Sequence, residues 1–100
     1  MSSETQDPTI RRLTVVDGKP NTNGDRLLAT FDANVSGIRI LACVLIERAD
    51  GTVKVSGPRG KTRYGNETST HFTDPDLSRA VCRKAAEIYA AFTGRQVFDD

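Results

Sequence analysis

The residues of this chain best suited to chemistry gather in one short stretch, residues 54–66. The stretch holds one aromatic residue, no acid, and four cations: Lys54, Arg59, Lys61 and Arg63. Its glycines let the backbone approach a ligand closely, and its cations attract anions. The stretch therefore predicts a basic, glycine-rich loop that meets phosphate groups. A solvated surface loop is the alternative that the sequence leaves open.

Nucleic acid is the ligand that this composition favours. Arg59, Lys61 and Arg63 alternate and would project along one side of an extended segment, where Tyr64 would stack on a base or sugar. Two arginines one turn apart on the outer face of a predicted helix would extend the positive surface: Arg79 and Arg83. Each of these six residues is equally suited to a solvated surface.

Catalytic groups, in contrast, do not form a constellation. Ser69 and Thr70 precede the single histidine, His71, but neighbours in a strand point to opposite faces, so neither hydroxyl is expected to be aimed at it. Residues 57–62 end in Gly-Lys-Thr like a phosphate-binding loop, yet Val55 stands where the first glycine belongs. One histidine and no Cys-x-x-Cys pair give no zinc site. The sequence predicts no enzyme, no metal and no cofactor.

Composition narrows the class of protein further. One hundred residues indicate one domain, and a net charge of +1 means that any anion binding arises from local asymmetry. Cys43 and Cys82 lie in apolar segments and are expected to be buried and reduced. No signal peptide and no apolar run of membrane-spanning length is visible. We therefore expect a cytoplasmic protein that does not contact a membrane.

Alternating apolar residues predict a sheet. Strands are expected at Ile10–Val16, at 26–35, at Ile38–Arg48 and at Thr52–Ser56, with a weaker fifth at Thr68–Phe72. In the second strand the inward face would carry Leu27, Ala29, Phe31, Ala33 and Val35. Residues 1–8 read as a disordered tail, 9–94 as the domain, and 95–100 as a short C-terminal tail.

The third strand is apolar on both faces. One face would carry Ile38, Ile40, Ala42, Val44 and Ile46, and the other Leu41, Cys43 and Leu45. Both faces are then expected to be covered, but a single helix covers one. Either the strand is central in a small covered sheet or a second copy packs on it, which predicts a homodimer.

A helix should follow the sheet. Asp74 suits its N-cap, Pro75 its first turn and Asp76 the positive end of its dipole, while Thr73 with Asp76 would form a capping box one residue earlier. Gly94 would end it. Its apolar face would hold Leu77, Val81, Ala85, Ile88, Tyr89 and Phe92. The predicted fold is α+β, an antiparallel sheet of four to five strands followed by one C-terminal helix, as a homodimer.

In order and spacing, residues 10–92 resemble the SpoVG family (stage V sporulation protein G, a small bacterial regulator). The matching segments are Ile10-Arg11-Arg12-Leu13, residues 24–32, Ile38-Arg39-Ile40-Leu41, residues 57–62 in place of the family's Met-Pro-Ser-Lys-Arg loop, and Thr70-His71-Phe72-Thr73 where the family has Ala-His-Pro-Ile. The resemblance implies a dimeric α+β domain that binds nucleic acid and regulates gene expression.

These observations together predict a small regulatory protein that binds DNA or RNA phosphates through its basic glycine-rich loop. The alternative is a protein–protein interaction module, in which the third strand and the Val97-Phe98 tail form an apolar docking surface. A third hypothesis is a single-strand binder like a class of transcriptional coactivators that also place strands before one helix in a dimer. An enzyme would require a concave pocket around His71.

Overall fold

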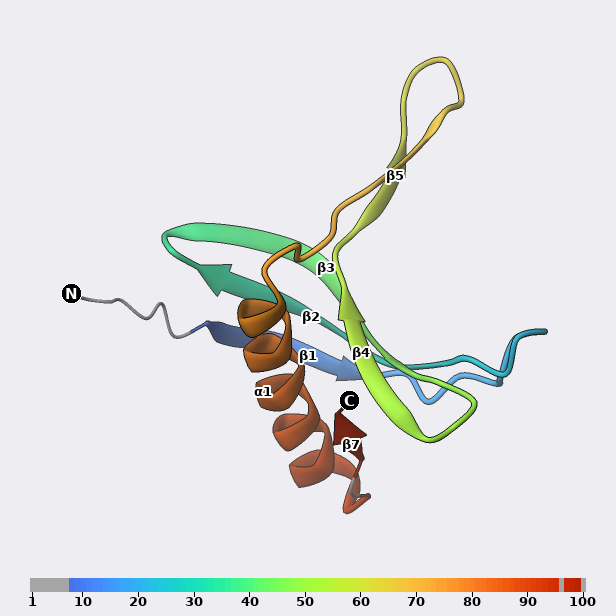
Figure 1. Cartoon of the computed structure of the whole chain (residues 1–100), viewed down its shortest axis with the longest axis vertical. Helices are drawn as coiled ribbons and strands as arrows, with labels where there is room; N and C mark the ends of the chain where they lie inside the picture. The colour runs from blue at the N-terminus through green and yellow to red at the C-terminus, as the bar shows by residue number, and fades with distance from the viewer. Residues whose placement is uncertain (1–7, 96, 100) are drawn as a thin grey trace.

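The structure, a computed structural model, describes residues 8–95 and 97–99. Their elements follow the order β1 (Thr9–Val15), β2 (Arg26–Val35), β3 (Ile38–Glu47), β4 (Thr52–Ser56), β5 (Arg59–Lys61), β6 (Glu67–Ser69), α1 (Pro75–Thr93) and β7 (Phe98–Asp99). Figure 1 shows α1 lying across one face of the main sheet, with a second, two-stranded sheet projecting away from it. The predicted α+β fold, with an antiparallel sheet and a C-terminal helix, is confirmed.

The main sheet has the order β1-β2-β3-β4-β7. Strands β1 to β4 pair antiparallel in chain order, β1 with β2, β2 with β3 and β3 with β4. The short strand β7 instead runs parallel to β4, with Phe98 opposite Thr52. Val97 packs against the core, so this part of the tail docks on its own domain, whereas the interaction-module hypothesis used it as a docking surface for a partner.

The ends of α1 follow the sequence signals. Asp74 is the N-cap, and its side chain accepts a hydrogen bond from the backbone N–H of Asp76 at 3.0 Å. Pro75 occupies the first helical position, where its missing N–H costs nothing. At the other end Gly94 adopts a left-handed conformation with φ 75° and donates its N–H to the carbonyl oxygen of Ala90.

The core lies between α1 and the sheet. Its buried members are Leu28, Ala29, Phe31, Ala33, Val35, Cys43, Leu45, Val53, Val81, Cys82, Ala85, Ala86 and Tyr89. The prediction that Phe92 shares this core is wrong, because its side chain is 66% exposed. Phe92 points in nearly the same helical direction as the buried Val81 and Ala85. Its exposure therefore means that the last turn of α1 extends past the sheet.

Two irregularities in strand pairing change which residues face the core. Between Leu27 and Ala29 the register of β2 against β3 shifts, and Leu28, predicted to point away from the core, is fully buried there. A second shift lets Leu41 and Ala42 of β3 oppose Asp32 of β2. A bulge of this kind inserts one residue and exchanges the faces beyond it.

The bulge in β3 corrects the predicted composition of its two faces. Ile40 pairs with the buried Ala33 and packs against the core, as do Cys43 and Leu45 farther along. Ala42, Val44 and Ile46 remain on the side away from α1, which we call the open face. Ile40 therefore does not share a face with these three residues, as strict alternation would require.

The chain ends and the cysteines complete the description. Residues 1–7 of the predicted tail lie outside the described residues, and Pro8, assigned to the tail, is fully buried.

Cys43 and Cys82 are free and buried. Burial raises the pKa of the Cys43 thiol to about 11, with a smaller contribution from the carboxylate of Asp32, so it stays a thiol at neutral pH. No helix within residues 8–95 and 97–99 is both long and apolar enough to cross a membrane.

Candidate nucleic-acid interface

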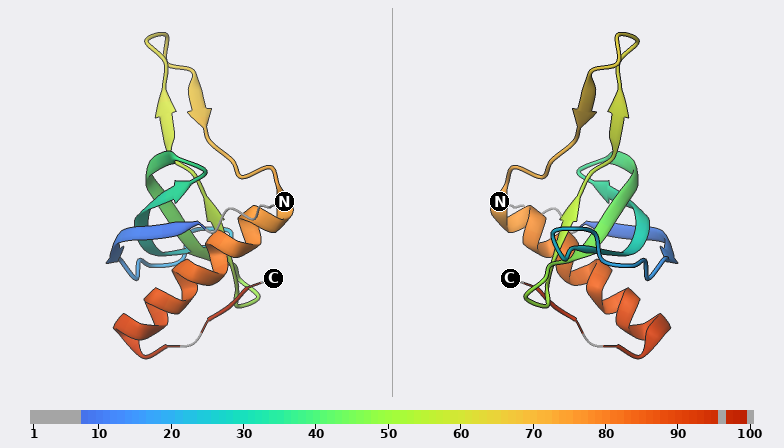
Figure 2. Two further views of the ribbon diagram at one scale, coloured as in Figure 1. Left: turned by 90° about the vertical axis from the view of Figure 1, so that its left-hand side faces the viewer. Right: turned by 90° about the vertical axis from the view of Figure 1, so that its right-hand side faces the viewer.

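Residues 57–66 of the basic stretch form one strand and the tip of a projecting hairpin, residues 57–70, which we call the arm. Lys54 lies in β4 of the main sheet. Arg59, Gly60 and Lys61 of β5 pair with Ser69, Thr68 and Glu67 of β6. Sequence patterns missed β5 and placed the following strand at Thr68–Phe72, because short exposed strands carry no buried alternation. Figure 2 shows the arm standing clear of the sheet and helix. Every residue from Arg59 to His71 is exposed.

A compact turn holds the tip of the arm. The backbone N–H of Thr62 donates to the carbonyl oxygen of Asn66 at 2.8 Å, and the Thr62 hydroxyl accepts from the N–H groups of Tyr64 and Asn66 at 3.3 and 3.2 Å. Gly65 supplies the positive φ that the turn requires. Tyr64 is thereby presented to solvent with its side chain 81% exposed.

The three predicted cations of the arm lie in two places, the strand β5 and the turn at its tip. Arg59 and Lys61 are two residues apart in β5 and therefore share one face of the arm, whereas Arg63 lies in the turn beside Tyr64. Glu67 stands directly opposite Lys61. The sequence analysis missed this acid because it follows the basic stretch in the chain. Three cations against one acid leave the arm with a net charge of +2.

The two helix arginines lie elsewhere. Arg79 and Arg83 are exposed on α1, and Arg79 has an ion pair of 3.9 Å with Asp76. The helix covers one face of the sheet, while Arg59 lines a hollow on the open face. The structure therefore brings Arg59 and Lys54 together at this hollow. Lys54 also lines a second hollow together with Arg79, whereas Arg83 is outside the lining of both.

Ser69 and His71 contact each other, contrary to the prediction that the hydroxyl would be poorly aimed. Ser69 Oγ lies 2.8 Å from His71 Nε2, because residues two apart in an extended segment share a face. Both side chains are exposed on the arm. Neither residue lines the hollow at Lys54 and Arg59, the hollow beside Phe72 and Arg79, or the one beside Pro8 and Lys84.

Gly57 fixes the base of the arm. Its N–H donates to the carbonyl oxygen of Thr70 at 2.9 Å, and a Cβ at this position would lie 2.7 Å from both that oxygen and the Thr70 Cβ. By contrast, a Cβ on Gly60 would meet only the Thr68 hydroxyl at 3.2 Å, and rotation of the Thr68 side chain can move that hydroxyl away.

We therefore expect Gly57→Ala to open the base of the arm, because backbone atoms must separate to admit the methyl group. In amide hydrogen exchange, Thr70 should lose about tenfold or more of its protection, corresponding to ~1.4 kcal/mol. Gly60→Ala is the matched control and should leave Thr70 unchanged. Equal protection in both variants would show that the close approach of Gly57 to Thr70 does not constrain the arm.

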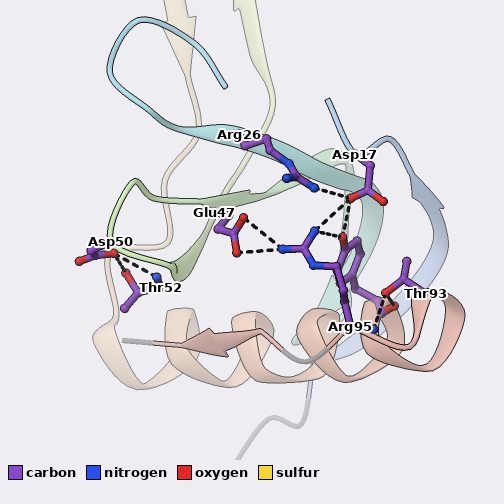
Figure 3. Close-up of polar contacts among 8 residues, drawn as sticks. Asp17, Arg26, Glu47, Asp50, Thr52, Thr93 and Arg95 are labelled. Carbon is purple, nitrogen blue, oxygen red and sulfur yellow. Dashed lines mark hydrogen bonds and ion pairs between the residues drawn. The ribbon is translucent and has the colours of Figure 1, made fainter. Parts of the chain in front are cut away.

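A polar network that the sequence analysis did not find ties the sheet to the end of α1 (Figure 3). Arg95 donates to both carboxylate oxygens of Glu47 at 3.0 and 3.2 Å and to the Tyr89 hydroxyl at 3.0 Å. Tyr89 in turn donates to Asp17, which also accepts from Arg26 at 3.3 Å. These residues come from four separate parts of the chain, so no local pattern could have indicated the network.

The network makes stability depend on pH. The hydroxyl of Tyr89, followed by the guanidinium groups of Arg26 and Arg95, holds the pKa of Asp17 below its ordinary value of 3.8 against the opposing effect of desolvation. A depressed pKa stabilises the fold fully above the unfolded value, and this stabilisation is lost as the pH falls through the folded value. Asp17→Asn should therefore be less stable than wild type in urea at pH 7, and the gap should narrow below pH 3.8. A gap that is the same at both pH values would exclude this charge-dependent contribution.

Metal ligands do not gather in the described part of the chain: it contains no group of three or more histidine, cysteine, aspartate or glutamate residues able to hold an ion. No protein-family model, curated protein or solved structure matches this chain.

Proposed function

We propose that this protein is a small nucleic-acid-binding regulator that contacts phosphates through the arm. One observation carries the proposal: the exposed hairpin bears Arg59, Lys61, Arg63 and a solvent-facing Tyr64, and it projects from a domain that buries none of them. A projecting cationic hairpin can enter a nucleic-acid groove or lie along a strand. The resemblance to the SpoVG family supports the same reading.

Phosphate contacts would provide most of the affinity. The guanidinium and ammonium groups of Arg59, Lys61 and Arg63 would neutralise phosphates and release counterions, while Tyr64 would stack on a base or sugar. Arg79 and Arg83 would add charge for a strand that continues onto the helix side. The mechanism requires no catalysis, and a reducing cytoplasm suits the two free, buried cysteines.

Two copies would present two arms at a fixed spacing. Ile38 and Leu41, near the start of β3, are 62% and 55% exposed. Ile38 is on the same side of β3 as the core-packed Ile40, whereas Leu41 is on the open face. A large exposed apolar side chain can take part in an interaction surface, and we propose that Leu41 contributes to the contact of a homodimer. A molecular mass near twice 10.9 kDa in light scattering, reduced to one copy in Leu41→Glu, is the expected result.

The test of the proposed function is fluorescence anisotropy with labelled duplex DNA, single-stranded DNA and RNA at several salt concentrations. The variant Arg59→Ala/Lys61→Ala/Arg63→Ala should bind weakly. With duplex DNA, its slope of log affinity against log salt should be shallower by about 2.7, because each phosphate contact contributes about 0.9. Lys19→Ala/Arg39→Ala/Arg48→Ala removes equal charge elsewhere and serves as the control. Salt-sensitive binding that survives in the arm variant would place the site elsewhere.

The interaction module remains the second candidate, and the exposed Ile38 and Leu41 favour it. Apolar docking depends little on salt, whereas phosphate binding weakens steeply as salt rises. Absence of binding to every nucleic-acid probe at low salt would therefore favour this candidate.

A further inference from the structure

The open face of the sheet contains a hollow of about 370 Å³, which falls within the range of about 300–1,000 Å³ that is typical of small-molecule sites. Its floor is aliphatic and consists of Leu27, Ala42, Val44 and Ile46. Ala42, Val44 and Ile46 share the open face by the ordinary alternation of β3. The register shift at Leu28 adds Leu27, which stands opposite Ile46 on that face. Without this shift Leu27 would share the core-facing side of β2 with Ala29.

Polar groups surround this apolar floor on opposite sides. Lys54 extends from β4 and Arg59 from the first residue of the arm, while Asp25 and Asn21 belong to the loop before β2. The Asn21 side-chain oxygen already accepts from the N–H groups of Asn23 and Asp25 at 2.9 and 3.0 Å, which orders this loop. Arg59 belongs to both the hollow and the charged face of the arm, so the two surfaces are continuous.

The chemistry of the hollow fits one unit of a nucleic acid. An aliphatic floor favours a flat, weakly hydrated ring, and a carboxylate such as Asp25 can accept from the N–H groups at the edge of a base. Two cations on the opposite rim suit the phosphate attached to the same nucleotide. Bases in a duplex are stacked and paired, whereas an unpaired strand can turn a base outward into a protein pocket.

We propose that the hollow binds a single unstacked nucleobase of a single-stranded nucleic acid whose phosphates lie on Lys54, Arg59 and the arm. This inference rests on the proposed function and narrows it from nucleic acid in general to an unpaired strand.

The test fills the hollow without touching the cations. Ser56 lines the hollow and stands opposite Val44 in the β3–β4 pairing, so Ser56→Phe projects a ring over the floor. Thr14, exposed on β1 opposite Thr30, faces the same side outside the hollow, and Thr14→Phe is the matched control. Anisotropy with a labelled 12-nucleotide single strand should show about tenfold weaker binding for Ser56→Phe than for wild type or Thr14→Phe. Binding to the matching duplex should be unchanged.

A second measurement uses only the wild-type protein and so does not depend on the folding of a variant. 2-Aminopurine within the same single strand is quenched by stacking, so its fluorescence should rise several-fold when the base enters an aliphatic hollow. Stacking on Tyr64 alone would leave it quenched, and unchanged or decreased fluorescence would overturn the proposal.

The remaining outcomes separate the two proposals. Equal single-strand affinity of Ser56→Phe and wild type, together with loss of binding in the arm variant, would overturn the base site and leave the proposed function standing. Dissociation of a dimer by Ser56→Phe would overturn the base site by showing that a second copy covers the hollow. No binding of any probe by the wild-type protein would overturn both.

Discussion

Tyr89→Ala is expected to destabilise the domain by about 3–5 kcal/mol, the usual cost of truncating a buried aromatic side chain. Tyr89 is the largest of the fully buried side chains, with 0% exposure, and its ring packs between α1 and the sheet. Domains of this size are stable by only about 5–15 kcal/mol, so the variant should unfold at a melting temperature more than about 10 °C lower.

Two further variants separate the contributions of Tyr89. Phe92→Ala removes an aromatic ring three residues later on the same helix, where 66% of the side chain is exposed, and should change stability by less than about 0.5 kcal/mol. Tyr89→Phe keeps the ring and removes the donor to Asp17, which should cost about 1–2 kcal/mol. Urea unfolding measures all three. A Phe92→Ala effect as large as that of Tyr89→Ala would mean that the last turn of α1 is packed in solution.

Removal of the arm is expected to weaken nucleic-acid binding strongly and leave the domain folded. Strands β5 and β6 contact each other, and within the described residues they contact no other helix or strand. Replacing Arg59–Ser69 by Asn-Gly connects Pro58 to Thr70 through a two-residue turn. The Thr70 N–H already donates a hydrogen bond of 3.0 Å to the Pro58 carbonyl oxygen. Asn-Gly favours the tight turn that this pairing needs.

The shortened protein should retain its melting temperature within a few degrees but bind duplex or single strand about 100-fold more weakly at 0.1 M salt, because three phosphate contacts are lost. Thermal unfolding and anisotropy on the same samples provide both readouts. An Asn-Gly replacement that binds as tightly as wild type would refute the arm as the phosphate site. A large loss of melting temperature would show instead that the arm supports the domain.

Some elements of this fold could be predicted from local sequence signals, and others depend on strand pairing that local signals do not show. Strand β2 and the boundaries of α1 follow local signals, namely a sustained alternation and the Asp74 cap with Gly94 at the far end. The bulges at Leu28 and at Leu41–Ala42 depend on what stands opposite in the neighbouring strand. The alternation of residues within one strand does not show which residues stand opposite in the neighbouring strand, so these bulges could not be predicted.

The candidate site shows the same division. The cations of the arm were evident from composition, but Glu67 faces Lys61 only once β5 and β6 pair. The hollow could not be anticipated either, because strict alternation assigns Leu27 to the inward face, and only the register shift at Leu28 places it opposite Ile46 on the open face. Pairing between strands, rather than residue type, decided the position of Glu67 and the face on which Leu27 lies.

The pairing of β7 with β4 has a consequence for how copies of this protein avoid sticking together. An open sheet edge presents unpaired backbone groups to which a neighbouring chain can add a strand, the first step toward aggregation. Beyond β4 that edge is occupied by β7. At the opposite edge β1 is interrupted by a register shift after Arg11 and by Arg12 in a left-handed conformation with φ 56°. Continuous growth of the sheet is therefore hindered on both sides.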